Sequence, residues 1–205
     1  MATVTLIRGA DLVGAPWKNG GGVTREVAAF PEQAGMDAFV WRVSIADVAQ
    51  AGPFSRFDGI DRTLVLLAGA GMVLDETVGA QVLKSHALKQ PLDLARFDGE
   101  VHIDARLVDG ATRDFNLMVR RDVAQGELDV WRGASQHNTQ RTFSADVVLL
   151  YCASGGVTVS VASGDAQSHA LETGDTLRID APDTLSCALE GTGVLLAITL
   201  RYTQH

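Results

Sequence analysis

The sequence is poor in the features that mark several large classes of protein. Among its 205 residues there are only two cysteines, Cys152 and Cys187, and both stand in apolar, strand-like runs. Buried reduced thiols are therefore expected rather than a disulfide framework. No apolar run approaches the roughly 20 residues that span a bilayer, and Met1 to Arg8 has no basic-then-apolar leader pattern. These absences predict a cytoplasmic protein with no membrane partner.

Basic residues are also too few for a partner that carries dense negative charge. The 17 Lys and Arg are outnumbered by 25 Asp and Glu, which gives a formal net charge of -8. Nucleic acids and anionic membranes both attract basic surfaces. The composition therefore predicts that the protein binds no nucleic acid.

Short strand-like segments, by contrast, recur from end to end between Gly, Asp and Pro residues. No segment of helical length has convincing caps and a 3.6-residue apolar stripe, although Ala46 to Ala51 could hold one short helical turn. The pattern predicts an all-β barrel or sandwich. The expected strands are Val4 to Ile7, Val23 to Phe30, Phe39 to Ala46, Arg62 to Leu67, Gly71 to Leu74, His102 to Leu107, Asp114 to Arg121, Leu128 to Arg132, Val147 to Cys152, Gly156 to Ala162, Thr176 to Ile179, Thr184 to Leu189 and Val194 to Leu200.

Two parts of the chain repeat one plan. Leu64 to Leu74 reads as a strand, a glycine turn and a strand, and Val148 to Val159 repeats this order. A strand-turn signal around Asp follows each of them. Two copies of one β unit predict a duplicated double-sheet barrel, with domains at 1–122 and 123–205.

Alternation along the strands separates an apolar face from a polar face, because successive side chains of a strand point to opposite sides. Trp41 to Ala46, Asp114 to Arg121 and Val23 to Ala28 share this design. The polar faces are either the solvated outside of a sandwich or the lining of a barrel interior. In the second case Arg42 and Arg120, balanced by Glu26, would suit a small anionic ligand. Asn116 could hydrogen-bond an amide or ring nitrogen.

A glycine triplet, Gly20-Gly21-Gly22, follows Pro16-Trp17-Lys18-Asn19 and opens the strand that begins at Val23. Without a Cβ the backbone there can turn sharply and approach other groups closely. The loop is either a plain connection before an edge strand or a device that presents Lys18, Thr24 and Glu26 to a pocket. No Gly-Lys-Ser/Thr sequence follows, so a phosphate-binding loop is not predicted.

Asp61 and Arg62 are adjacent at the start of another expected strand, after a loop rich in Gly, Pro and aromatic residues. Such a neighbouring pair is often a surface ion pair worth under about 1 kcal/mol. A place at the rim of a pocket, with Arg62 holding Asp61, is the alternative.

These segments together resemble the HutD/Ves family of bacterial proteins. The resemblance covers most of residues 1–122, and no common motif contains this combination. It implies a cupin-type β-barrel duplicated in one chain, that is, an all-β bicupin. The matching residues are Pro16 to Gly22 with Thr24 to Glu26, Trp41 to Ala46, Gly52 to Ser55, Asp61-Arg62 with Leu66 and Gly69 to Met72, Phe97 to Gly99, Asp114 to Met118, and Arg120-Arg121.

The resemblance also implies a biological setting. One branch of the family accompanies the histidine-degradation genes, where it is thought to act as an accessory or regulatory factor. Urocanate and N-formylglutamate would then be natural ligands, and both are small carboxylates. Another branch is described as stress-induced, so the resemblance does not choose the ligand.

Catalytic cupins typically hold a metal through a His-x-His pair, a Glu and a later His. The five histidines here never stand two residues apart, and Ser55 to Asp58, where the pair would fall, contains none. His102 and Asp104 could supply two ligands, but a neighbouring His and Asp on a strand is more often a surface pair. We expect no metal and no other cofactor.

Catalysis without a metal stays open as an alternative. Glu26 beside Lys18 could act as an acid/base pair in an isomerase or hydrolase. The same two residues could equally orient a bound ligand, which is the interpretation we prefer.

The sequence therefore predicts a metal-free bicupin that binds a small anionic metabolite in its N-terminal barrel. The C-terminal barrel, nearly all apolar or small from Val147 to Leu200, is expected to be structural or to form a homodimer. The predicted ligand-binding residues are Lys18, Thr24, Glu26, Arg42, Ser44, Asp61, Arg62, Asn116, Met118 and Arg120.

Overall fold

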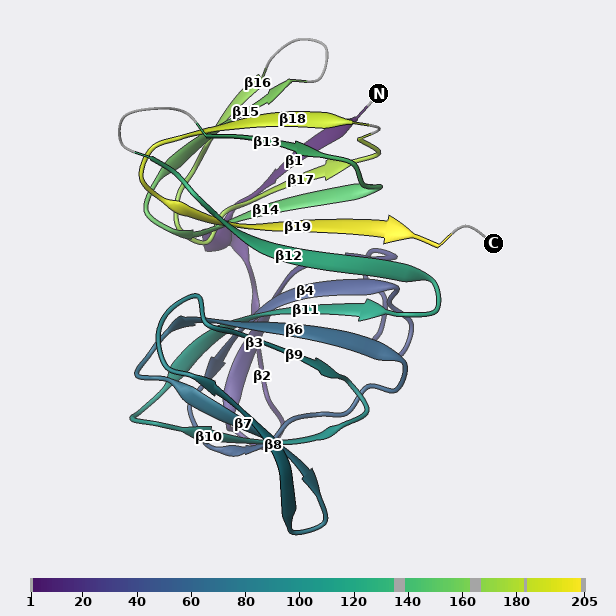
Figure 1. Cartoon of the computed structure of the whole chain (residues 1–205), viewed down its shortest axis with the longest axis vertical. Coiled ribbons are helices and arrows are strands. Elements are labelled where there is room, and N and C mark those ends of the chain that lie inside the picture. The colour runs from purple at the N-terminus through teal and green to yellow at the C-terminus, as the bar shows by residue number, and fades with distance from the viewer. Residues whose placement is uncertain (1, 135–138, 163–166, 183, 204–205) are drawn as a thin grey trace. The chain divides into compact units, whose positions relative to one another are not determined.

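The fold is described from a computed structural model that covers residues 2–134, 139–162, 167–182 and 184–203 (Figure 1). Within these ranges the chain is built from strands, and its one helical element is a single 3-10 turn, η1 (Gly9–Asp11). None of the described residues belongs to a helix that is long and apolar enough to cross a membrane. The all-β class predicted from the strand pattern is confirmed.

Residues Val13–Ala124 form one compact unit, which we call the first barrel. Two sheets face each other across a core of apolar residues from both, among them Leu64, Leu66, Met72, Leu74 and Ile103. The larger sheet has the order β2 (Gly14–Pro16), β3 (Gly22–Phe30), β4 (Trp41–Val48), β11 (Thr112–Arg120), β6 (Ile60–Ala68) and β9 (Leu94–Asp98). The smaller sheet has the order β5 (Gly52–Pro53), β10 (His102–Leu107), β7 (Met72–Val78) and β8 (Gln81–Leu88).

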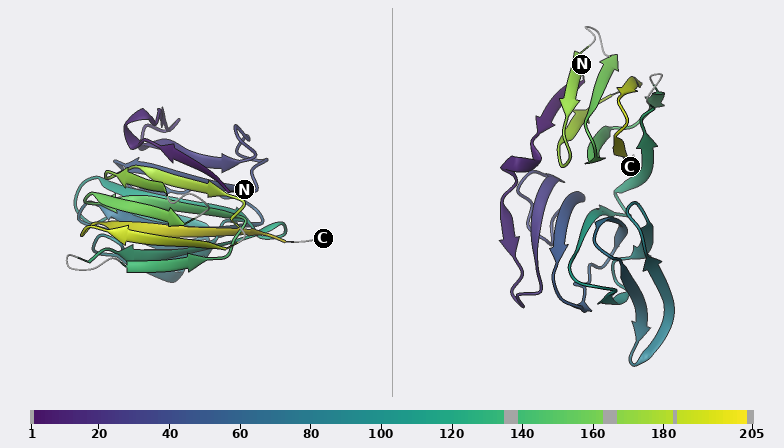
Figure 2. Two further views of the ribbon diagram at one scale, coloured as in Figure 1. Left: turned by 90° about the horizontal axis from the view of Figure 1, so that it is seen from above. Right: turned by 90° about the vertical axis from the view of Figure 1, so that its left-hand side faces the viewer.

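The residues up to Leu12 and those from Gln125 onward form the second compact unit, which we call the second barrel. Its larger sheet has the order β1 (Thr3–Ile7), β17 (Thr176–Asp180), β14 (Val147–Ser154), β19 (Val194–Tyr202) and β12 (Ala124–Arg132). Its smaller sheet has the order β13 (Thr139–Phe143), β18 (Leu185–Glu190), β15 (Val157–Ala162) and β16 (Gln167–Leu171). Figure 2 shows the two layers of each barrel from two further directions.

The two barrels repeat one topology. The orders β4-β11-β6-β9 and β5-β10-β7-β8 of the first barrel return as β12-β19-β14-β17 and β13-β18-β15-β16 in the second. Every strand number is raised by eight, so β14 is the counterpart of β6 and β19 that of β11. The duplication predicted from Leu64 to Leu74 and Val148 to Val159 is confirmed, because these segments are β6-β7 and β14-β15.

The N-terminal strand departs from the predicted division of the chain at residue 122. β1 pairs along its length with β17, from Thr3 opposite Asp180 to Ile7 opposite Thr176. Val4 and Leu6 pack against the apolar core of the second barrel, which explains why the first residues join the last ones.

Every predicted strand overlaps an observed one, whereas the predicted helical turn at Ala46 to Ala51 is wrong, because β4 continues to Val48. The sequence predicts β9 only as part of a strand-turn signal. It does not predict β2, β5, β8, β13 and β16. These strands are two to eight residues long and most of their side chains are partly or fully exposed. A short strand without a buried apolar face gives little alternation to recognise.

Candidate ligand-binding site

Three neighbouring strands of the first barrel carry polar residues on the face that points into its interior. The pairing register of β4, β11 and β6 arranges these residues in three rows across the sheet. The first row is Arg42, Met118 and Arg62, the second is Ser44, Asn116 and Leu64, and the third is Ala46, Asp114 and Leu66. All nine side chains are buried. The polar faces of β4 and β11 are therefore interior surfaces.

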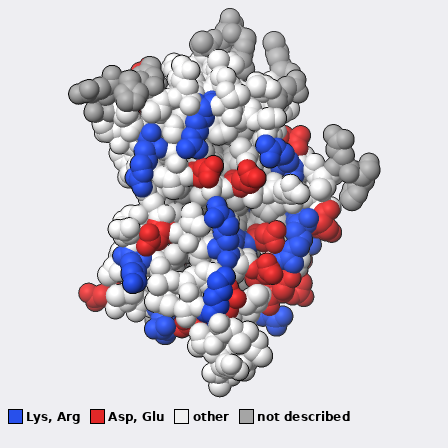
Figure 3. Space-filling view, viewed as in Figure 1, with Lys and Arg blue, Asp and Glu red and all other residues white. Residues whose placement is uncertain are grey.

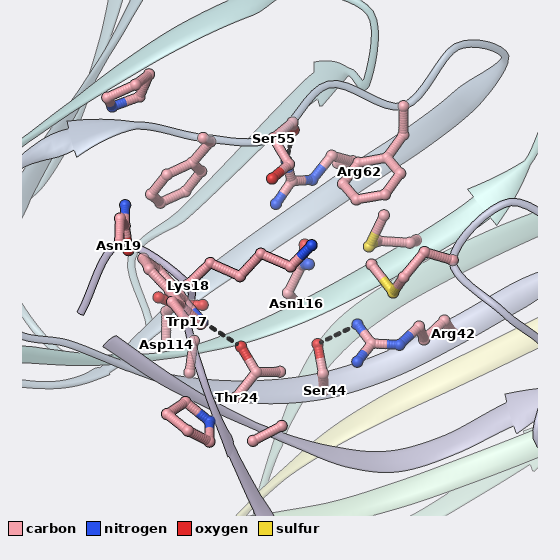
Figure 4. A pocket seen from close by; sticks show the side chains of 18 residues that line it. Trp17, Lys18, Asn19, Thr24, Arg42, Ser44, Ser55, Arg62, Asp114 and Asn116 are labelled. Atoms are coloured by element: carbon pink, nitrogen blue, oxygen red, sulfur yellow. Dashed lines mark hydrogen bonds between the residues drawn. The ribbon is translucent and has the colours of Figure 1, made fainter. Parts of the chain in front are cut away.

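A cavity of about 580 Å³ opens onto these rows (Figure 4). That volume is within the range of small-molecule sites, which measure roughly 300–1,000 Å³. The lining combines cationic, amide and hydroxyl groups with apolar and aromatic side chains. It consists of Ala15, Pro16, Trp17, Lys18, Asn19, Thr24, Met36, Arg42, Ser44, Ala46, Pro53, Phe54, Ser55, Phe57, Arg62, Asp114, Asn116 and Met118.

Arg42 is held on one side of the cavity by two side chains. Its Nε donates to Oε2 of Glu26 at 2.7 Å, and its Nη1 donates to Oγ of Ser44 at 3.2 Å. The side chain of Arg42 is only 11% exposed, whereas that of Glu26 is 41% exposed. Glu26 therefore approaches Arg42 from the solvent side, and Arg42 also lines the cavity.

Arg62 lies in a cage of three aromatic rings. Its guanidinium carbon is 5.5 Å from the ring centre of Phe54, 5.7 Å from that of Phe57 and 5.1 Å from that of Phe97. Nη1 donates to the carbonyl of Ser55 at 3.2 Å, but the buried Nε has no partner among the described residues. Burial lowers the pKa of Arg62 to about 10, which still leaves it a cation at neutral pH. Cation–π contacts of this kind are attractive even where water is excluded.

Asp114 and Asn116 are two buried polar residues of β11 in these rows. Asp114 is 2% exposed and Asn116 is 8% exposed. Neither Oδ2 of Asp114 nor Oδ1 of Asn116 has a hydrogen-bond partner in the part of the chain that the structure describes. Burial raises the pKa of Asp114 to about 7, although Arg62 opposes the shift. The described residues of the three rows thus include two cations and only one carboxyl group, which is weakly acidic.

The glycine loop forms one wall of the cavity. The backbone N–H of Trp17 donates to the carbonyl of Gly22 at 2.9 Å, and its indole N–H donates to Oγ1 of Thr24 at 2.8 Å. Gly22 packs so closely that an added Cβ would lie 2.5 Å from the carbonyl oxygen of Asp47. The loop turns back in this way and sets the exposed Lys18 over the opening, where Figure 4 shows its side chain extended.

The structure brings seven of the predicted residues together around the cavity and leaves three outside its lining. Those in the lining are Lys18, Thr24, Arg42, Ser44, Arg62, Asn116 and Met118. Glu26 is outside but holds Arg42. Its partner is thus Arg42, not Lys18 as the acid/base alternative supposed.

Asp61 and Arg120 point elsewhere. Asp61 accepts from Nε of Arg121 at 2.8 Å, so it is not held by Arg62. Neighbouring residues of a strand face opposite ways, which separates the two side chains. Arg120 ends β11, and its guanidinium donates to the carbonyls of Phe39 and Asp37, both at 3.2 Å. The second guanidinium of the cavity is therefore that of Arg62.

Asp114, Trp17 and the aromatic rings around Arg62 are site residues that were not predicted from the sequence. Asp114 shares its strand face with Asn116 and Met118, so the alternation contained the signal for it. The rings of Phe54 and Phe57 come from the loop between β5 and β6, and no periodicity predicts where loop side chains point.

Among its described residues, the second barrel has no counterpart of these polar rows. Its inward-facing residues on β14 are Val148, Leu150 and Cys152, which pair with Thr199, Ala197 and Leu195 of β19. Where the first barrel has Arg62, Asn116 and Asp114, the second has Val148, Ala197 and Leu195. These residues belong to a packed apolar core. The fold therefore does not require polar groups at these positions.

No three His, Cys, Asp or Glu side chains of the described residues gather into a group that could hold a metal. Nδ1 of His102 is 3.8 Å from Oδ2 of Asp104, and the hydroxyl of Thr77 contacts both residues. On the molecular face in Figure 3, Lys and Arg are interspersed with Asp and Glu rather than gathered into one patch.

Comparison with known proteins identifies close relatives of this chain. The HutD family matches residues 9–197. An uncharacterised 21.2 kDa protein in the hutC 3' region of Pseudomonas putida is 36% identical over 187 residues, which is 90% of this chain and 91% of that protein. The protein Ves of Escherichia fergusonii is 40% identical over 115 residues, or 56% of each chain.

Solved structures agree with the fold. The structure of HutD from Pseudomonas fluorescens SBW25, in a formate condition, has a TM-score of 0.81 and 32% identity and covers 98% of this chain and 100% of that one. A 2-hydroxyethylphosphonate dioxygenase, a cupin-fold protein, has a TM-score of 0.71 with 10% identity and covers 96% of this chain and 78% of that one. At that identity the likeness concerns the fold alone, and it supports the cupin-type barrel.

Proposed function

The chain belongs to the HutD family, and we propose that it is a non-catalytic protein that binds a small carboxylate metabolite in the first barrel. Urocanate and N-formylglutamate are the candidate ligands, and the role is that of an accessory or regulatory factor in histidine utilisation. The family and the names of its relatives support the biological setting. The chemistry of the cavity supports the class of ligand.

One observation carries the proposal, namely two buried guanidinium groups that face one cavity. Arg42 and Arg62 lie in the same row of the sheet, separated by Met118, so their Cα atoms are about 10 Å apart across two strand spacings. The positive charge of Arg42 lowers the pKa of Arg62, which means that the two cations repel one another. A carboxylate between them would relieve this repulsion, and Arg is well suited to bind it through paired N–H groups.

Lys18 adds a third positive charge at the opening, on a flexible stem that can follow a ligand. The apolar part of the lining, with Met36, Met118 and Phe57, suits a short carbon chain or ring. The cavity thus offers a cationic end and an apolar body to a small organic acid.

A thermal-shift titration tests this proposal. The ligands are urocanate, N-formylglutamate, histidine, glutamate and formate. A ligand at about 100 times its Kd stabilises the fold by about 2.7 kcal/mol. We expect such a shift with a carboxylate in the wild-type protein and in Arg120→Ala, and its loss in Arg42→Ala. A shift that Arg42→Ala retains, or the absence of a shift with every compound, would contradict the proposal.

The same samples test the alternative of a metal-independent enzyme. A binding protein returns urocanate and N-formylglutamate unchanged after prolonged incubation, as liquid chromatography can establish. Turnover that Glu26→Gln abolishes would instead favour the isomerase or hydrolase. The homodimer, the cytoplasmic location and the absence of a nucleic-acid partner stay predictions, and light scattering measures the first of them.

A further inference from the structure

Two buried acceptor atoms of the cavity lack a donor in the part of the chain that the structure describes. Oδ2 of Asp114 and Oδ1 of Asn116 are buried and have no hydrogen-bond partner among the described residues. In native proteins most buried polar atoms are paired, because an unpaired one costs about 1–3 kcal/mol. The corresponding positions of the second barrel hold Leu195 and Ala197, so an apolar pair is compatible with this fold.

The register fixes where these acceptors lie relative to the cations. Asn116 is one row, and Asp114 two rows, along the strands from Arg42 and Arg62. Each row advances by two residues, or about 7 Å. A ligand whose carboxylate meets the guanidinium groups therefore extends toward Asn116 and Asp114 if it is longer than a few atoms.

On the basis of the proposed function, we propose that Asp114 and Asn116 form a second subsite that recognises an N–H group of the ligand. The cavity then selects organic acids that carry a ring or amide N–H beyond the carboxylate, and it discriminates against acids of the same shape without one. Asp114 and Asn116 are specificity-determining residues, whereas Arg42 and Arg62 bind the anion.

The discrimination follows from the cost of unpaired atoms. An acid without the N–H group would fill the cavity and shield both acceptors from water while giving them no donor. Sites built to hydrogen-bond a ligand reject analogues that lack the donor far more strongly than apolar pockets reject a missing methyl group. Burial raises the pKa of Asp114, so an N–H donor placed against its carboxylate would stabilise the charged form that burial disfavours.

A matched pair of ligands tests this subsite. Urocanate and trans-3-(furan-2-yl)acrylate share the acrylate and a five-membered ring, but only urocanate carries a ring N–H. We expect isothermal titration calorimetry on the full chain at pH 8, where Asp114 is largely ionised, to give urocanate an affinity about tenfold or more above that of the furan analogue. Equal affinities would overturn the subsite while leaving the carboxylate proposal intact. If neither acid binds, the subsite fails, and the proposed function fails with it only if N-formylglutamate and the other carboxylates also give no thermal shift.

Two variants of Asn116 test whether its acceptor oxygen causes the preference for a ligand with an N–H group. Asn116→Leu removes one acceptor without a large change of volume. It should lower the ratio of the urocanate affinity to the furan-analogue affinity severalfold, chiefly because urocanate binds more weakly. Asn116→Asp keeps an acceptor oxygen and should retain a ratio near that of the wild type, even if its added charge weakens both acids. An unchanged ratio in Asn116→Leu, together with a wild-type melting profile, would remove Asn116 from the subsite.

Discussion

At the scale of single residues, Arg62 shows most clearly that the interior of the first barrel is arranged for something other than stability. Its buried Nε finds no partner among the described residues, which is costly, and the second barrel has Val148 at the corresponding position. The three aromatic rings around Arg62 and the carbonyl of Ser55 compensate only part of that cost. Residues of this kind are expected at binding sites, where stability is exchanged for function.

Replacement of Arg62 by Met should therefore separate stability from binding. Met fills a similar volume and makes favourable sulfur contacts with aromatic rings. We expect the free energy of unfolding, from urea titration, to stay within about 1 kcal/mol of the wild type or to rise. Carboxylate affinity should fall by about 100-fold or more, since a buried charge contact is worth about 2–5 kcal/mol. A loss of several kcal/mol of stability would instead make Arg62 a structural residue.

The raised pKa of Asp114 leads us to expect an unusual dependence of stability on pH. Burial raises its folded-state pKa from 3.8 to about 7, so between these values the folded protein binds a proton that the unfolded chain has released. Stability that depends on this group is present at low pH and is lost as pH rises toward 7. The difference in unfolding free energy between wild type and Asp114→Asn should thus shift against the wild type by up to about 1.4 kcal/mol per pH unit from pH 5 to 7. A flat difference over this range would show that the folded-state pKa is not raised.

At the scale of elements, the glycine loop and β3 form the wall that carries Trp17 and Lys18. Gly22→Ala would push a Cβ to 2.5 Å from the backbone of Asp47 and 3.1 Å from the Trp17 ring. We expect a loss of about 1–3 kcal/mol in unfolding free energy, as for other overpacked sites. Gly35→Ala is the matched control, because an added Cβ there meets nothing within 4 Å. Equal stabilities of the two variants would show that the loop adjusts freely.

Part of the site could be predicted from the alternation of polar and apolar residues along the strands. This alternation selected Arg42 and Ser44 on β4 and Asn116 and Met118 on β11, because these strands are regular and cross the barrel centre. It could not separate Arg120 from them, since the end of a strand has the same parity as its middle but different surroundings. Nor could it assemble the cage around Arg62, whose rings come from a loop and from β9.

At the scale of the whole molecule, one topology occurs twice with two different interiors. The repeat was visible in the sequence because β6-β7 and β14-β15 share a strand-glycine-strand pattern. The pairing of β1 with β17 of the second barrel was not visible in the sequence. Pairing between residues so far apart in the chain produces no local sequence pattern. The described core of the second barrel is apolar, whereas the first barrel has a polar cavity. This is the difference expected if the first barrel binds the proposed ligand and the second is structural.

This difference predicts that ligand binding stabilises the two barrels unequally. With N-formylglutamate at about 100 times its Kd, amides of the first barrel that exchange only by its unfolding should gain about 100-fold protection, equivalent to about 2.7 kcal/mol. Hydrogen exchange read by mass spectrometry should place this gain in β3, β4, β6 and β11, whose residues surround the cavity. Peptides from β14, β15 and β19 should change little, because their core is already filled without a ligand. Equal protection throughout would show that the barrels unfold as one cooperative unit, and protection confined to the second barrel would place the ligand outside the cavity proposed for it.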